Sequence, residues 1–196
     1  MSIPSVVLAS EATQEQVLKA ASLAFCADPF MRWIMPSAPE FLPGFMDMVG
    51  LFAAGVSVAD STTFHTEQFE GVAIWLKPNV HGDEEGTMAW IAEHVREDIH
   101  ADLGYVLESM GNYRAQNEPC WYLSVLGVDP AFQRQGLGSV MMKHVTRIVD
   151  ELGLPAYLES SNPDNISLYL RHGFEVVGQI QKGTSPVVTP MMRPAR

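Results

Sequence analysis

The chain has 196 residues, of which 47% are hydrophobic and 18% are charged, a balance typical of one globular α/β domain and unlike that of disordered or fibrous chains. Its 23 acidic and 12 basic residues give a net charge of −11, which repels phosphate backbones and anionic lipids and so argues against nucleic acid and membranes as partners. We therefore expect a single domain over residues 1–196.

Metal and disulfide sites are not expected either. Cys26 and Cys120 form no CxxC pair, and the six histidines lack the spacing of zinc-binding motifs. The start of the chain has no basic segment followed by an apolar run, and no stretch of about eighteen apolar residues occurs. The expected location is the cytoplasm, where thiols stay reduced.

The first predicted elements are a strand at Val6–Leu8 and a helix that extends to residue 24. Thr13 with Gln16 three residues later has the pattern of a capping box at the start of this helix. Prolines then predict several short pieces, before a more continuous helix over residues 45–58; they stand at positions 29, 36, 39 and 43. Methionines and aromatic residues are frequent over residues 31–48, and they suit either a core or a pocket wall.

A hairpin and a helical region follow. Residues 61–66 and 71–77 alternate as two paired strands, and the second ends at a proline. Residues 84–114 have a mostly helical pattern, with Gly104 and Gly111 as the expected breaks.

The last third of the chain predicts strands and helices in alternation, the order of an α/β sheet with crossover connections. The helix over residues 164–172 should be closed by Gly173 at the position after its C-cap. The other expected elements are strands over residues 121–128, 156–160 and 174–181, and a helix over residues 136–151.

The turn from Gln133 to Ser139 joins an apolar strand to a helix, where free backbone N–H groups and the positive end of the helix dipole favour an anion. Gly136 and Gly138 let the backbone approach a diphosphate closely, and Arg134 adds a positive charge. An ordinary glycine-containing helix start is the alternative. A Walker motif and a dinucleotide fingerprint both fail, because Ser139 and Met141 stand where those motifs need lysine and glycine.

The order of these segments resembles the GNAT superfamily of N-acetyltransferases. Val128-Asp129-Pro130 followed by Gln133-x-x-Gly136-x-Gly138 is similar to the family's acetyl-CoA motif, and Asn162, Asn165, Tyr169 and Gly173-Phe174 follow in the family's order. Within the superfamily the likeness is to puromycin N-acetyltransferase-like members. It is strong over residues 120–181 and faint before them.

This resemblance implies an α/β (α+β) GNAT fold, in which helices flank a mixed central sheet of about seven strands and a splayed pair of strands binds acetyl-CoA. Residues 1–118 would form the acceptor-side half and residues 119–196 the acetyl-CoA-binding half. A bulge in the binding strand is expected at Gly127.

The resemblance also implies roles for named residues. Tyr169 would be the general acid for the CoA sulfur, and Asn162 and Asn165 would hold the pantetheine amides, with turn capping as the alternative for both. The remaining acetyl-CoA contacts would come from the backbone of one strand and from the loop after it; they are Leu126, Val128, Gln133, Arg134, Gln135, Gly136, Leu137, Gly138 and Ser139.

Glu159 stands at the end of an apolar strand, where a partly buried carboxylate suits a general base, although such acids are often structural. Asp28 and Glu118 are weaker candidates for attracting a cationic substrate. The expected function is acetyl-CoA-dependent transfer of an acetyl group to the amine of a small molecule, such as an antibiotic, an amino-acid analogue or a polyamine. A non-catalytic acyl-CoA-binding module and a protein N-acetyltransferase are the alternatives, and the chain could be a monomer or a homodimer.

Overall fold

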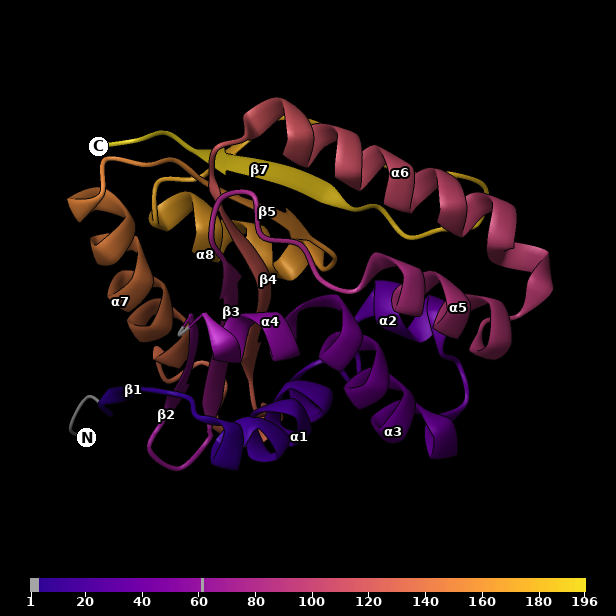
Figure 1. Cartoon of the computed structure of the whole chain (residues 1–196), viewed down its shortest axis with the longest axis horizontal. Helices are drawn as coiled ribbons and strands as arrows, with labels where there is room; N and C mark the ends of the chain where they lie inside the picture. The colour runs from indigo at the N-terminus through magenta and orange to yellow at the C-terminus, as the bar shows by residue number, and fades with distance from the viewer. Residues whose placement is uncertain (1–3, 61) are drawn as a thin grey trace.

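The computed structural model describes residues 4–60 and 62–196, and these form a seven-stranded mixed sheet (Figure 1). The strand order is β1-β2-β3-β4-β5-β7-β6. All neighbouring strands are antiparallel except β4 and β5, which are parallel. The strands are β1 (Val6–Leu8), β2 (Thr63–Thr66), β3 (Gly71–Leu76), β4 (Trp121–Val128), β5 (Ala156–Ser160), β6 (Glu175–Val176) and β7 (Thr189–Arg193).

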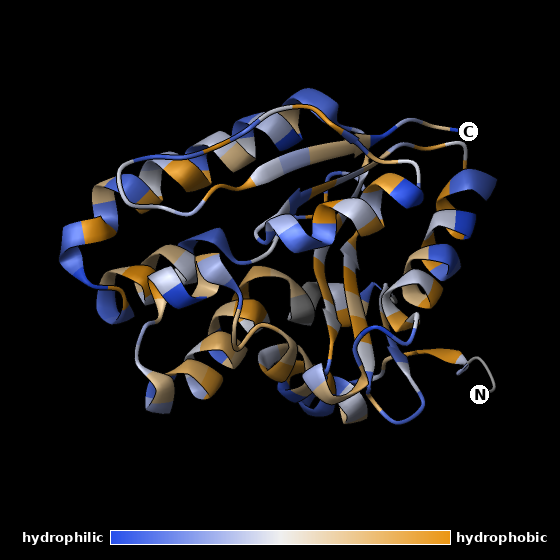
Figure 2. Cartoon of the chain, turned by 180° about the vertical axis from the view of Figure 1, so that it is seen from behind, coloured by the Kyte–Doolittle hydropathy of each residue, from blue (hydrophilic) through white to orange (hydrophobic). Residues whose placement is uncertain are grey.

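Helices cover both faces of this sheet and divide the core into two parts. On one face α7 packs against β3 and β4, and Figure 2 shows the hydrophobic residues of this helix on the side that faces the sheet. The N-terminal helices and α6 contribute to the core on the other face. The helices are α1 (Gln14–Ala24), α2 (Pro29–Ile34), α3 (Ala38–Val49), α4 (Gly55–Ala59), α5 (Glu84–His94), α6 (His100–Asn117), α7 (Leu137–Glu151) and α8 (Ile166–Arg171).

One extra residue, Ser124, interrupts the pairing of β4 with β3. Ile74 pairs with Val125 and Trp75 pairs with Leu123, so Ser124 has no partner across the ladder. Such a bulge reverses the alternation of side chains along the strand. Tyr122 and Val125 consequently belong to the same half of the core, although they are three positions apart in the strand.

The bulge was expected at Gly127, and that expectation is wrong. Gly127 pairs regularly with Val72. Its lack of a side chain is instead required by helix packing, because a Cβ at this position would lie 2.7 Å from the Cβ of Ala24 in α1.

The parallel strands β4 and β5 pair only at their beginnings. Trp121 to Leu123 of β4 face Ala156 to Leu158 of β5. Beyond this point β5 pairs with β7 on its other side, whereas β4 continues to Val128 along β3. The two strands therefore diverge from Ser124 and Glu159 onward, as a splayed pair does.

The N-terminal half departs from expectation in two places. The side chain of Thr13 accepts a hydrogen bond from the backbone of Ser10 at 2.9 Å, so the capping interaction lies one turn earlier than expected and α1 begins at Gln14. Pro43 lies inside α3, which ends at Val49 before a π-helical turn and α4. The hairpin of β2 and β3 is confirmed, and Ser61, the first residue expected in it, lies outside the described residues.

Gly104 and Gly111 were expected to break a helix, yet both lie inside α6. The break occurs before them, at Val95 and the 3₁₀ turn Glu97–Ile99. A glycine costs a helix only about 1 kcal/mol, and the buried residues Leu103 and Val106 outweigh that cost through packing.

The C-terminal strands were only partly predicted. The strand expected over residues 174–181 is limited to β6, with an isolated bridge from Ile180 to Val188. The chain then returns as β7 between β5 and β6. The sequence did not predict this strand, which contains Pro190, because proline is unusual inside a sheet. Arg193 fixes its end through two hydrogen bonds to the Asp150 carboxylate, at 2.7 and 2.8 Å.

Two glycine-to-alanine substitutions should have opposite effects on stability. Gly127→Ala forces β4 away from α1 and should lower the free energy of unfolding by about 1 to 3 kcal/mol. Gly111→Ala adds a methyl group to an exposed helical position where nothing lies within 4 Å, and should raise stability by about 0.5 to 1 kcal/mol. Urea denaturation of both variants measures the difference. Equal effects would contradict the packing role of Gly127.

Candidate functional site

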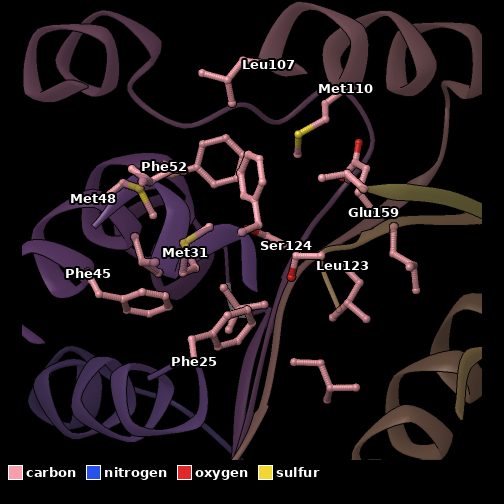
Figure 3. A pocket seen from close by; sticks show the side chains of 18 of the residues that line it. Phe25, Met31, Phe45, Met48, Phe52, Leu107, Met110, Leu123, Ser124 and Glu159 are labelled. Carbon is pink, nitrogen blue, oxygen red and sulfur yellow. The ribbon is translucent and has the colours of Figure 1, made fainter. Parts of the chain in front are cut away.

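Two connected cavities lie where β4 and β5 diverge. A groove of about 800 Å³ runs over the end of β4, the loop before α7 and the start of α8. A smaller pocket of about 120 Å³ lies between the strands and the N-terminal helices (Figure 3). Four residues line both cavities, and they are Phe25, Leu126, Asn165 and Tyr169. The two cavities therefore adjoin each other at these residues.

The start of α7 presents free hydrogen-bond donors to the groove. The first bond of this helix runs from the N–H of Val140 to the carbonyl of Gly136. Within the described chain, the N–H groups of Leu137, Gly138 and Ser139 consequently have no backbone acceptor. Gly136 has a φ of 88°, a left-handed conformation that glycine adopts without strain. These donors and the helix dipole form an anion-binding site.

The side chains of this loop have distinct surroundings. Arg134 lines the groove and adds a positive charge to it, and Gln133 donates a hydrogen bond to the carbonyl of Val128 at 3.1 Å. Ser139 Oγ lies 2.7 Å from Nε2 of His172, whose pKa is lowered by burial. Gln135 does not line either cavity. The other loop residues expected at the site, Gly136, Leu137 and Gly138, all line the groove.

Leu126 and Val128 of β4 line the groove beyond the point at which β5 leaves this strand. Asn162 and Asn165 lie across from them at the start of α8. The side chain of Asn162 accepts a hydrogen bond from the N–H of Asp164 at 3.0 Å, so turn capping is one of its roles. Both asparagines that the sequence singled out thus line the groove.

Tyr169 lies at the junction of the two cavities. Its side chain is buried, and burial together with the negative charge of Asp28 raises the pKa of its hydroxyl. The phenol is therefore protonated at neutral pH and can act as a proton donor.

The two weaker acidic candidates have structural partners. Asp28 caps α2 by accepting hydrogen bonds from the N–H groups of Phe30 and Met31 at 3.0 Å, and its second oxygen accepts one from Ser161 at 2.7 Å. Glu118 binds Arg114 and the N–H of Cys120. Asp28 lines the groove, and its carboxylate oxygens already accept these hydrogen bonds, whereas Glu118 lines neither cavity.

The pocket has mainly apolar walls. Met31, Phe45 and Met48 lie on the side of the N-terminal helices, as Figure 3 shows, so the methionine-rich segment lines a pocket as well as filling the core. Leu107 and Met110 come from α6. The sequence did not point to either residue, because the apolar residues of the segment 84–114 are not concentrated on one face of a helix.

Glu159 reaches this pocket from β5 (Figure 3). Burial raises the pKa of its carboxyl to about 7, although the nearby groups of Tyr122, Tyr157 and Arg114 lower it. Its Oε2 is buried and has no hydrogen-bond partner among the described residues. A carboxyl with a pKa near neutrality suits proton transfer at physiological pH.

A comparison with protein families identifies this architecture. The model of the acetyltransferase (GNAT) family matches residues 61–174, which is more than half of the chain. The chain belongs to the acetyltransferase (GNAT) family. Acetyltransferases of this family use acetyl-CoA, and the free donors at the start of α7 fit its diphosphate.

One curated relative is an uncharacterised N-acetyltransferase of Schizosaccharomyces pombe, 28% identical over 124 residues that make up 54% of this chain and 47% of the relative. The chain thus matches about half the length of that relative. Within this family, the likeness to puromycin N-acetyltransferase-like members has no support from these comparisons.

Solved structures share the fold. A histone acetyltransferase HPA2-related protein of Corynebacterium glutamicum has a TM-score of 0.68 at 23% identity, covering 100% of this chain and 98% of its own. Arylalkylamine N-acetyltransferase 2 of Aedes aegypti has 0.67 at 12% identity, covering 100% of both chains. The polyamine N-acetyltransferase of Drosophila melanogaster has 0.61 at 14% identity, covering 96% of this chain and 99% of its own. The predicted fold class is confirmed.

None of the helices in residues 4–60 and 62–196 combines the length and apolar character that a membrane crossing needs. No three His, Cys, Asp or Glu side chains of these ranges gather as metal ligands would.

Replacing Glu159 with Gln should change the pH dependence of stability. In the folded protein the Glu159 carboxyl has a pKa of about 7. In the unfolded chain a glutamate has a pKa of about 4.3. The wild type should therefore lose stability between these values as pH rises, and Glu159→Gln should not. Urea denaturation from about pH 4 to pH 8 measures both proteins. A constant difference across this range would show that Glu159 does not titrate there.

Proposed function

We propose that this acetyltransferase moves an acetyl group from acetyl-CoA to the amine of a small molecule. The observation that carries the proposal is the junction of the two cavities at Tyr169. One cavity has free N–H donors for a diphosphate, and the other is an apolar pocket with one titratable carboxyl. Bound acetyl-CoA would supply the activated acetyl thioester.

The groove residues would hold this co-substrate in three sections. The N–H groups of residues 137–139 and the guanidinium of Arg134 would bind the diphosphate. The backbone of Leu126 and Val128, freed by the divergence of β5, would bind the pantetheine arm together with Asn162 and Asn165. Gln133 would hold the loop against the end of β4 through its bond to Val128. Gln135 would contribute only its backbone.

The chemistry of the transfer needs one proton acceptor and one proton donor. Glu159 would accept the proton of the attacking amine, because its buried carboxyl titrates near neutral pH. Tyr169 would donate a proton to the departing sulfur, because its hydroxyl stays protonated. Residues 1–118 would then supply most of the acceptor side, and residues 119–196 most of the co-substrate side.

The pocket supports a small acceptor over the two alternatives. A protein substrate needs an open groove for an extended segment, whereas side chains of the N-terminal helices and of α6 line this small pocket. A binding module without activity does not need a titratable carboxyl opposite the acyl site. Likeness to puromycin N-acetyltransferase-like members would fit a small acceptor and remains part of this proposal.

Calorimetric titration with CoA tests the groove. Gly138→Val should weaken CoA binding at least about tenfold, because a Cβ at this position already lies 3.2 Å from Leu168 and larger groups would close the approach to the free N–H groups. Gly111→Val in α6 is the matched control and should leave CoA binding unchanged. No heat of binding with the wild type would overturn the proposal.

Tyr169→Phe tests the proton donor. The variant keeps the ring that packs against Phe174 and loses only the hydroxyl, so kcat should fall about 100-fold or more while the affinity for CoA stays within about twofold of the wild type. Thiol release from acetyl-CoA across a panel of amines measures the first quantity, and calorimetry the second. Unchanged kcat would remove Tyr169 as the acid.

A further inference from the structure

We infer that the acceptor is a primary amine attached to one compact apolar group, aromatic or branched, and that Ser124 and Glu159 hold its nitrogen. This inference rests on the proposed function and names the substrate class of the same pocket. It also adds Ser124 to the specificity-determining residues.

The polar end of the pocket is formed by Ser124 and by the carboxyl of Glu159, which has the hydroxyls of Tyr122 and Tyr157 close to it. Ser124 Oγ and Glu159 Oε2 are buried, line the pocket and have no hydrogen-bond partner among the described residues. Buried polar atoms in folded proteins are almost always paired, so each such atom requires an explanation. A bound amine supplies it, because its two or three hydrogens can be donated to both oxygens.

The backbone explains how these two side chains meet the same cavity. Ser124 is the bulged residue of β4, and Glu159 follows the last residue of β5 that pairs with β4. Both therefore lie where the strands begin to diverge. Leu126, which lines both the pocket and the groove, lies in the same region. A nitrogen held here would therefore lie next to the groove that would hold acetyl-CoA.

The remaining walls suit an apolar group. Figure 3 shows methionine and phenylalanine side chains across the pocket from the strands, and they include Met31, Met48, Phe45 and Phe52. Methionine adapts its shape and its sulfur makes favourable contacts with aromatic rings. The cavity volume of about 120 Å³ is close to that of engineered apolar cavities of about 150 Å³ that bind benzene. One ring or one branched chain therefore fits.

The distribution of charge argues against diamines and polyamines. Glu159 is the single carboxylate among the described lining residues of the pocket, and the carboxylate of Asp28 is occupied by three hydrogen bonds. A second ammonium group would lie against methionine and phenylalanine without a counter-charge. Burying an unpaired charge in this way is strongly unfavourable.

The test is calorimetric titration of the full chain, saturated with CoA, with 2-phenylethylamine and with spermidine. We expect 2-phenylethylamine to bind at least about 100-fold more tightly, and kcat/KM in thiol release from acetyl-CoA to follow the same order. Equal or tighter binding of spermidine, or binding of neither amine to a protein that binds CoA, would overturn this inference. If the protein did not bind CoA, that result would instead contradict the proposed function.

Variants separate the two ends of the pocket. Ser124→Ala should weaken 2-phenylethylamine binding about tenfold through the lost hydrogen bond, with CoA affinity unchanged. Met110→Glu places a second carboxylate in the apolar wall, so spermidine should gain affinity and 2-phenylethylamine should lose it. Thermal unfolding checks that each variant folds. Unchanged amine affinity in folded Ser124→Ala would exclude that residue from amine binding.

Discussion

The divergence of two parallel strands is the constraint on which the rest of this structure depends. A sheet satisfies the backbone N–H and C=O groups of its strands through neighbours, and β4 keeps β3 on one side but loses β5 on the other after Leu123. The groove that includes the start of α7 and the smaller apolar pocket both have lining residues in this region. Both cavities, and Tyr169 between them, follow from this single departure from regular pairing.

Much of the C-terminal half could be predicted from the sequence, because its signals are local. The glycines at 136 and 138, the apolar strands and the helix stop at Gly173 all act over a few residues, and the structure places β4, α7, β5 and α8 close to their expected bounds. The expected groove residues gather around one cavity, apart from Gln135. What these residues do to a ligand remains a prediction.

The features that could not be predicted depend on tertiary packing. The bulge lies at Ser124 and not at Gly127. The sequence could not show this, because a glycine in a strand marks either a bulge or a position where a helix approaches closely. Strand β7 was hidden by Pro190, and its place beside β5 depends on the distant partner Asp150. The wall from α6 was missed because glycines suggested breaks where packing maintains a helix.

The bond from Ser161 to Asp28 connects two elements that are 133 residues apart in the chain. Ser161 directly follows β5, and Asp28 fixes the first turn of α2, which carries Phe30 and Met31. An outward rotation of α2 must first release this hydroxyl. This single hydrogen bond thus ties the first turn of α2, beside the groove, to the loop that carries Asn162.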